Sequence, residues 1–124
     1  MIEFKNVSKL YDNNVKALSD VNIKIESGEF VFLVGPSGAG KSTFIKMLIK
    51  EVDPTVGEII VAGKKLSDIS RRQTPYYRRK IGMVYQDFRL IPTLNVYENV
   101  AFAMRVVEAS PKDIRKRVPM VLSL

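Results

Sequence analysis

The stretch Gly35-Pro36-Ser37-Gly38-Ala39-Gly40-Lys41-Ser42-Thr43 decides the fold, because it fits the pattern G-x-x-x-x-G-K-[ST]. Residues 30–34, directly before it, are continuously apolar, which is typical of a strand buried on both faces. After the motif, apolar residues recur at helical spacing, and Pro54 ends that pattern near Asp53. The order of strand, glycine-rich loop and helix predicts an α/β fold with a site for nucleotide phosphates.

Each fixed position of this loop has a physical role toward a polyphosphate. The glycines allow backbone conformations in which successive N–H groups converge on one anion, and the following helix directs its positive end to the same place. We expect Lys41 to reach the β and γ phosphates, Ser42 to ligate Mg²⁺ and Thr43 to bond the α phosphate. The residues predicted to hold the phosphates are Gly35, Pro36, Ser37, Gly38, Ala39, Gly40, Lys41, Ser42 and Thr43.

The composition excludes several classes of protein. The 124 residues contain no cysteine and no histidine, which excludes a disulfide scaffold, thiolate metal sites and Ser-His-Asp catalysis. No apolar run approaches the roughly 20 residues of a membrane-spanning helix, and the first residues do not form a secretion signal. We therefore expect a cytoplasmic chain of one compact domain.

The net charge of +7 is concentrated in one segment. Residues 64–80 hold seven cations against Asp68 alone. Such a segment fits an anionic membrane surface, nucleic acid, an acidic partner or, most simply, a solvated surface hairpin. No spacing typical of nucleic-acid-binding motifs accompanies the cations, so direct nucleic-acid binding is not expected.

Outside the loop, the part of the chain before residue 80 predicts antiparallel strands and a short helix. Apolar residues nearly alternate over residues 2–7 and 21–25, with a turn signal at residues 12–14 between them, which indicates a paired hairpin. A short strand is expected over residues 58–62 and a short helix after Pro75.

The last third predicts one more buried strand and two helices. Residues 81–85 form a second apolar run that ends at Gln86. Asn95 and Glu98 form a capping box that opens a helix to about Ala109. A second helix is expected to begin after Ser110 and to be interrupted at Pro119, and the apolar end at residues 120–124 suggests truncation.

Together these motifs resemble the N-terminal half of an ATP-binding-cassette (ABC) ATPase. Tyr11, about 24 residues before the loop, is similar in position to the family's aromatic residue that stacks on adenine. Gln86 is similar to the glutamine of the family's Q-loop, which ligates Mg²⁺ and positions water. The amino-acid sequence of residues 85–94 resembles that of bacterial cell-division ATP-binding subunits more than that of other family members. Transporters of the lipoprotein-release and macrolide-export type share much of this region and stay open as alternatives.

The resemblance implies a P-loop NTPase fold with an N-terminal antiparallel β-subdomain, part of a RecA-like core and the start of a helical subdomain. Residues 1–124 are then one incomplete nucleotide-binding domain, with residues 1–94 reaching through the Q-loop and residues 95–124 opening the helical subdomain. It implies ATP and Mg²⁺ as cofactors, the metal held by Ser42 and Gln86. It also implies a homodimer, and a membrane partner that docks near the Q-loop and the helical segment from Asn95 onward, with residues 88–91 as the docking candidates. This partner keeps the protein at the inner face of the plasma membrane and regulates cell-wall hydrolysis.

Several parts of the family's catalytic machinery are absent from the sequence. The signature motif, the Walker B strand with its glutamate, the D-loop and the switch histidine are not found. We therefore expect these 124 residues to bind ATP without hydrolysing it, with no catalytic residue of their own. Two other functions are kept as alternatives. One is a non-catalytic, self-associating nucleotide-binding fragment. The other is a small P-loop kinase whose lid carries the arginines of residues 71–79.

Overall fold

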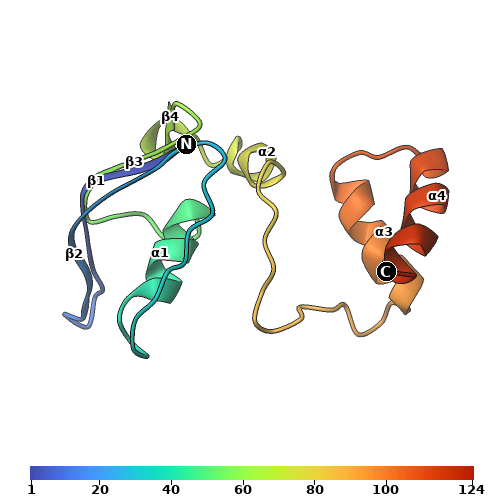
Figure 1. Ribbon diagram of the computed structural model, residues 1–124, viewed down its shortest axis with the longest axis horizontal. Helices are drawn as coiled ribbons and strands as arrows, with labels where there is room; N and C mark the ends of the chain where they lie inside the picture. Colours follow the sequence, from blue (N-terminus) through green and yellow to red (C-terminus); the bar gives the residue numbers. More distant parts are fainter. The chain divides into compact units, whose positions relative to one another are not determined.

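The computed structural model describes residues 1–124 and divides them into two units, Met1–Arg78 and Arg79–Leu124 (Figure 1). In the first unit, four antiparallel strands lie in the order β2-β1-β3-β4. Their bounds are β1 Ile2–Leu10, β2 Lys16–Ile25, β3 Val56–Val61 and β4 Lys64–Lys65. The predicted hairpin is confirmed, with Ile2 opposite Ile25 and Phe4 opposite Ile23.

A bulge in β1 explains why Phe4 and Val7 both face the core although they are three residues apart. Side chains of a regular strand alternate between faces, so residues 4 and 7 would lie on opposite sides. Asn6 has a left-handed φ of 50°, and the register shifts between Phe4 and Val7. The extra residue returns Val7 to the core, where Phe4 is 1% and Val7 0% exposed.

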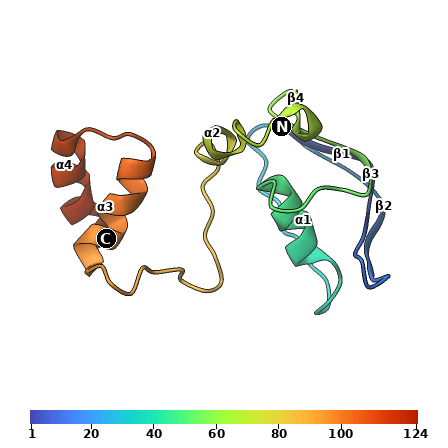
Figure 2. The same cartoon turned by 180° about the vertical axis from the view of Figure 1, so that it is seen from behind.

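Helix α1 (Lys41–Leu48) follows the glycine-rich loop and covers one face of this sheet (Figures 1 and 2). The ring of Phe4 stacks on Phe44 with centroids 4.3 Å apart and planes 15° from parallel. The buried residues that join the sheet, α1 and the segment after β4 are Phe4, Val7, Phe44, Met47, Ile59, Leu66 and Ile69. The unit is completed by a short 3-10 helix, η1 (Leu66–Asp68), and by α2 (Thr74–Arg78), which confirms the predicted short helix.

The second unit is a pair of helices, α3 (Val96–Val106) and α4 (Pro111–Leu122), around Ala101, Ile114 and Val118. The predicted caps are confirmed: the Asn95 side chain accepts from the Glu98 N–H, and the Ser110 hydroxyl accepts from the Asp113 N–H.

The ends of these two helices differ from the sequence prediction. Helix α3 ends at Val106, three residues before Ala109. The predicted interruption at Pro119 is wrong, because α4 continues through it to Leu122. Proline removes one N–H donor, but its carbonyl still accepts from the Ser123 N–H at 3.1 Å, so the last turn remains closed.

The two predicted buried strands, residues 30–34 and 81–85, are also wrong as elements of this structure. Neither segment is paired with any strand, and Phe30 and Val84 are 84% and 94% exposed. A strand needs neighbours for its N–H and C=O groups, and a strand buried on both faces also needs covering layers. No segment of residues 1–124 supplies them to these two runs.

Candidate functional site

Gly40 shapes the turn from the glycine-rich loop into α1. It has a left-handed φ of 86° at the position that caps the helix. A Cβ built there would lie 2.3 Å from the carbonyl oxygen of Ala17 in β2. Glycine is therefore required both by the backbone conformation and by the close approach of β2.

The ammonium group of Lys41 turns back over the loop. Its Nζ donates to the carbonyl oxygens of Gly35 and Pro36, the latter at 2.7 Å. The first turn of α1 holds no acidic side chain, so the positive end of the helix is not neutralised locally. Residues 35–39 and Ser42 are exposed. The loop thus presents an accessible, positively charged surface that suits an anion.

Tyr11 and Thr43 lie next to each other although they are far apart in the sequence. The Tyr11 hydroxyl is 3.2 Å from the Thr43 hydroxyl, and Thr43 is only 8% exposed. Lys9 Nζ lies 5.3 Å from the centroid of the Tyr11 ring. The structure therefore brings the residue predicted to stack on adenine to the helix that carries the loop.

Gln86 lies in the second unit, in an irregular segment, with its side chain exposed. Joint binding of Mg²⁺ by Ser42 and Gln86 stays a prediction. Close to Gln86, the guanidinium of Arg89 lies 3.7 Å from the centroid of the Tyr85 ring and 3.5 Å from the Asp87 carboxylate. Phe88 has no such contact and is 88% exposed.

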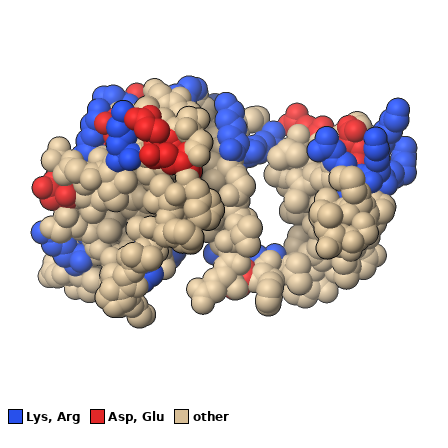
Figure 3. Space-filling view, in the orientation of Figure 1, with Lys and Arg blue, Asp and Glu red and all other residues tan.

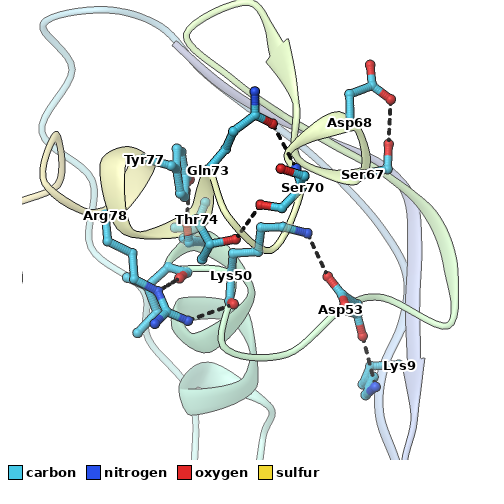
Figure 4. Close-up of polar contacts among 12 residues, drawn as sticks. Lys9, Lys50, Asp53, Ser67, Asp68, Ser70, Gln73, Thr74, Tyr77 and Arg78 are labelled. Atoms are coloured by element: carbon cyan, nitrogen blue, oxygen red, sulfur yellow. Dashed lines mark hydrogen bonds and ion pairs between the residues drawn. The ribbon is translucent and has the colours of Figure 1, made fainter.

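A set of contacts at the far end of α1 was missed at the sequence level (Figure 4). The Tyr77 hydroxyl donates to the carbonyl of Leu48, and Arg78 donates to the carbonyls of Ile49 at 2.8 Å and Lys50 at 2.9 Å. These carbonyls lie at the end of α1, where no N–H group of the helix donates to them. Burial raises the pKa of the Tyr77 hydroxyl above its usual value of 10.0. Arg78 belongs to the basic segment, and no local spacing indicates contacts to residues 28 and 29 positions away.

The structure shows no cluster of three or more acidic, cysteine or histidine side chains suited to a metal ion. No helix has the length and apolar character needed to cross a membrane.

A glycine-rich loop that ends at the N-terminus of a helix beside an antiparallel sheet is the arrangement of an ATP-binding cassette. The family model of the ABC transporter matches residues 18–122, and the chain belongs to this family. The structure is similar to the ATP-binding cassette MJ0796 in a dimeric post-hydrolysis state bound to ADP and Pi. The TM-score is 0.88 at 37% identity, over 99% of this chain and 56% of that one.

Among curated proteins, the chain is similar to the cell division ATP-binding protein FtsE of Bacillus subtilis (strain 168), with 55% identity over 124 residues. It is 46% identical to FtsE of Streptococcus pneumoniae serotype 2 (strain D39 / NCTC 7466) over the same length. All of this chain is covered in both comparisons, but only 54% of each relative. The chain therefore spans about half the length of the curated relatives it matches.

Proposed function

We propose that the chain binds ATP through residues 35–43, as part of an ABC-type ATPase. The observation that carries this proposal is the position of the Lys41 ammonium, held against the loop carbonyls of Gly35 and Pro36 at the positive end of α1. On binding, the ammonium exchanges these carbonyls for the β and γ phosphate oxygens, which are stronger acceptors because they are charged.

The other site residues orient the nucleotide. The Tyr11 ring supports the adenine base through its π face, and the hydroxyl of Thr43, in the first turn of α1, bonds the α phosphate. Ser42 and Gln86 are the residues that would hold Mg²⁺, since a hydroxyl and an amide oxygen both suit this hard cation. When bound, the metal supplies neutralisation of phosphate charge.

We further propose that the chain forms part of an FtsE-like subunit that works with an FtsX-like membrane protein in bacterial cell division. The 55% and 46% identities to two FtsE proteins, over all 124 residues of this chain, support this assignment. In that setting, residues 1–94 and residues 95–124 belong to one nucleotide-binding domain, and two copies form a homodimer that hydrolyses ATP. The membrane partner keeps the subunit at the inner face of the plasma membrane and passes its motion to cell-wall hydrolases.

Calorimetric titration of Mg–ATP into the chain tests the nucleotide site. Lys41→Ala removes a charge-assisted contact worth about 1.5–3 kcal/mol, so the dissociation constant should rise by about 10- to 150-fold. Lys46→Ala is the matched control, because this exposed lysine lies in the last turn of the same helix, away from the loop. Equal affinities for the wild type and Lys41→Ala would refute the phosphate site.

The assignment of the membrane partner has a separate test. Phe88 is 88% exposed beside Gln86, and its ring is the largest exposed apolar side chain of residues 86–91. We expect Phe88→Ala to lower the amount of the FtsX-like protein recovered by pull-down, while ATP affinity stays unchanged. Recovery equal to that of the wild type contradicts the proposed docking site.

A second candidate function is that of a self-associating, non-catalytic nucleotide-binding fragment. The exposed apolar run at residues 30–34 favours it, because Phe30, Phe32 and Val34 are each about four-fifths exposed and lack strand partners. Size-exclusion chromatography with light scattering distinguishes the two functions. A monomer at all accessible concentrations contradicts this second candidate.

A further inference from the structure

The basic segment of residues 64–80 divides into cations that are bound within the protein and cations that are not. Lys65 lies 2.6 Å from the Glu58 carboxylate, which raises the pKa of Lys65 through their hydrogen bond. Arg78 caps the end of α1, and Arg79 lies 2.7 Å from a carboxylate oxygen of Glu108. These three cations have structural partners.

Of the remaining four cations, Lys80 belongs to the second unit. Lys64, Arg71 and Arg72 belong to the first unit and differ from the three paired cations. All three are exposed, and no carboxylate lies within ion-pairing distance of any of them. We name these three residues the basic surface. In Figure 3, Lys and Arg side chains lie along the edge of the first unit where β4 and α2 lie, with Asp and Glu side chains between some of them.

The backbone that carries the basic surface is anchored, so its charges have a fixed place on the first unit. Leu66 and Ile69, which are 4% and 9% exposed, belong to the core and lie between Lys64 and the two arginines. The Gln73 side chain accepts from the Ser70 N–H at 2.9 Å, which closes the turn that holds Arg71 and Arg72. The charges are therefore presented by a folded segment.

We infer that the basic surface contacts the anionic phospholipid headgroups of a membrane. Its cations come from β4 and from a turn, so they are spread over a surface and do not line a pocket. Tyr76, 61% exposed a few residues away, has the amphipathic ring that is enriched at membrane interfaces. This contact adds to the attachment through a protein partner and does not depend on nucleotide binding.

Nucleic acid is a poorer match for the same charges. Side chains that bind nucleic acid are usually presented by a helix in a groove or beside stacking aromatic platforms. Helix α2 has only five residues, and its Arg78 is turned toward the backbone of α1. Neither Arg71 nor Arg72 lies on a helix.

The expected size of the effect follows from the number of free cations. Each Lys or Arg close to an anionic bilayer raises the partition coefficient about fivefold, so three account for about 100-fold at low ionic strength. The attraction falls within a Debye length, which shortens from about 10 Å at 0.1 M salt to about 3 Å at 1 M. Binding through the basic surface must therefore be sensitive to salt.

Co-sedimentation of the chain with vesicles tests the inference without nucleotide or protein partner. The vesicles are phosphatidylcholine alone, or phosphatidylcholine with about 30% phosphatidylglycerol. We expect binding only to the anionic vesicles, and its loss in about 1 M salt. Equal binding to both vesicles, insensitive to salt, would overturn the inference and indicate adsorption through the exposed apolar runs.

Two triple variants with the same change in charge locate the contact. Replacement of Lys64, Arg71 and Arg72 by Gln should lower binding to anionic vesicles about 100-fold. Replacement of Lys112, Arg115 and Arg117 by Gln in α4 removes the same charge from other exposed positions and should lower it by no more than about threefold. Equal losses in the two variants, or no loss in the first, would overturn the inference.

Two further measurements separate this inference from the proposed function. The Lys41→Ala variant should bind vesicles as the wild type does, and the first triple variant should keep its ATP affinity. Binding to duplex DNA or RNA in place of anionic vesicles, weakened by the first triple variant, would overturn the membrane contact. It would leave the nucleotide site untouched.

Discussion

The hydrogen bond between Tyr11 and Thr43 predicts an unequal response to removal of its two hydroxyl groups. Tyr11→Phe keeps the ring but leaves the Thr43 hydroxyl, on a residue that is 8% exposed, without its partner. Thr43→Val keeps the shape of the side chain and leaves the Tyr11 hydroxyl without its partner. Because Tyr11 is half-buried, its hydroxyl can bond water instead.

The magnitudes follow from burial. An unsatisfied buried hydroxyl costs about 1–3 kcal/mol, whereas the net value of one hydrogen bond is about 0.5–1.5 kcal/mol. We expect Tyr11→Phe to lower the free energy of unfolding by about 1–3 kcal/mol and Thr43→Val by less. The double variant should cost about as much as Thr43→Val alone, since no hydroxyl is then left unpaired.

Thermal unfolding followed by circular dichroism measures these differences. For a unit of this size, 1 kcal/mol corresponds to a fall in the melting temperature of about 4–8 °C. Tyr85→Phe, at a tyrosine with no side-chain hydrogen bond, is the control and should stay within about 0.5 kcal/mol of the wild type. Additive losses in the double variant, or an unchanged melting temperature for Tyr11→Phe, would refute the reasoning.

Three further predictions concern α1 and its two ends. Gly40→Ala forces a Cβ to within 2.3 Å of the Ala17 carbonyl at a left-handed φ, so it should unfold the loop entry, lower the melting temperature and abolish ATP binding in calorimetry. Arg78→Gln removes the caps at the end of α1 and should lower the free energy of unfolding by about 1–3 kcal/mol in urea titrations, whereas Arg71→Gln, at an exposed arginine, should not change it. Burial in the folded state raises the pKa of Tyr77, so the stability that its neutral hydroxyl contributes is complete below pH 10.0. This contribution is lost as the pH rises through the higher folded value, and the melting temperature should fall. A melting temperature that rises above pH 10.0 would contradict the prediction.

The sequence predicts the parts of the molecule that depend on neighbours along the chain. The hairpin of β1 and β2, the loop into α1 and the caps at Asn95 and Ser110 all rest on local patterns, and the structure confirms them. The bulge at Asn6 cannot be predicted from the sequence, because it is needed only when Val7 faces the same core as Phe4.

The two incorrectly predicted strands and the missed role of Arg78 involve partners that are not neighbours along the chain. Residues 30–34 have the composition of a central strand, but composition alone does not supply the adjacent strands that give it hydrogen bonds. Arg78 illustrates the opposite case, in which a residue assigned to a solvated basic segment has a specific structural task. Local spacing could not distinguish it from Arg71, because the acceptors lie at the end of another helix.

The contacts that hold α1 and the turn into it do not involve the two predicted strands that are missing from the fold. Gly40 is pressed against Ala17 of β2, and Tyr11, directly after β1, bonds Thr43 in the first turn of α1. At the other end, Arg78 holds the last carbonyls of the same helix. All of these contacts lie within Met1–Arg78, where the antiparallel sheet and α1 share one core. Because α1 and the turn at Gly40 are held within this unit, we expect the N-terminal end of α1 to keep its position although residues 30–34 are unpaired.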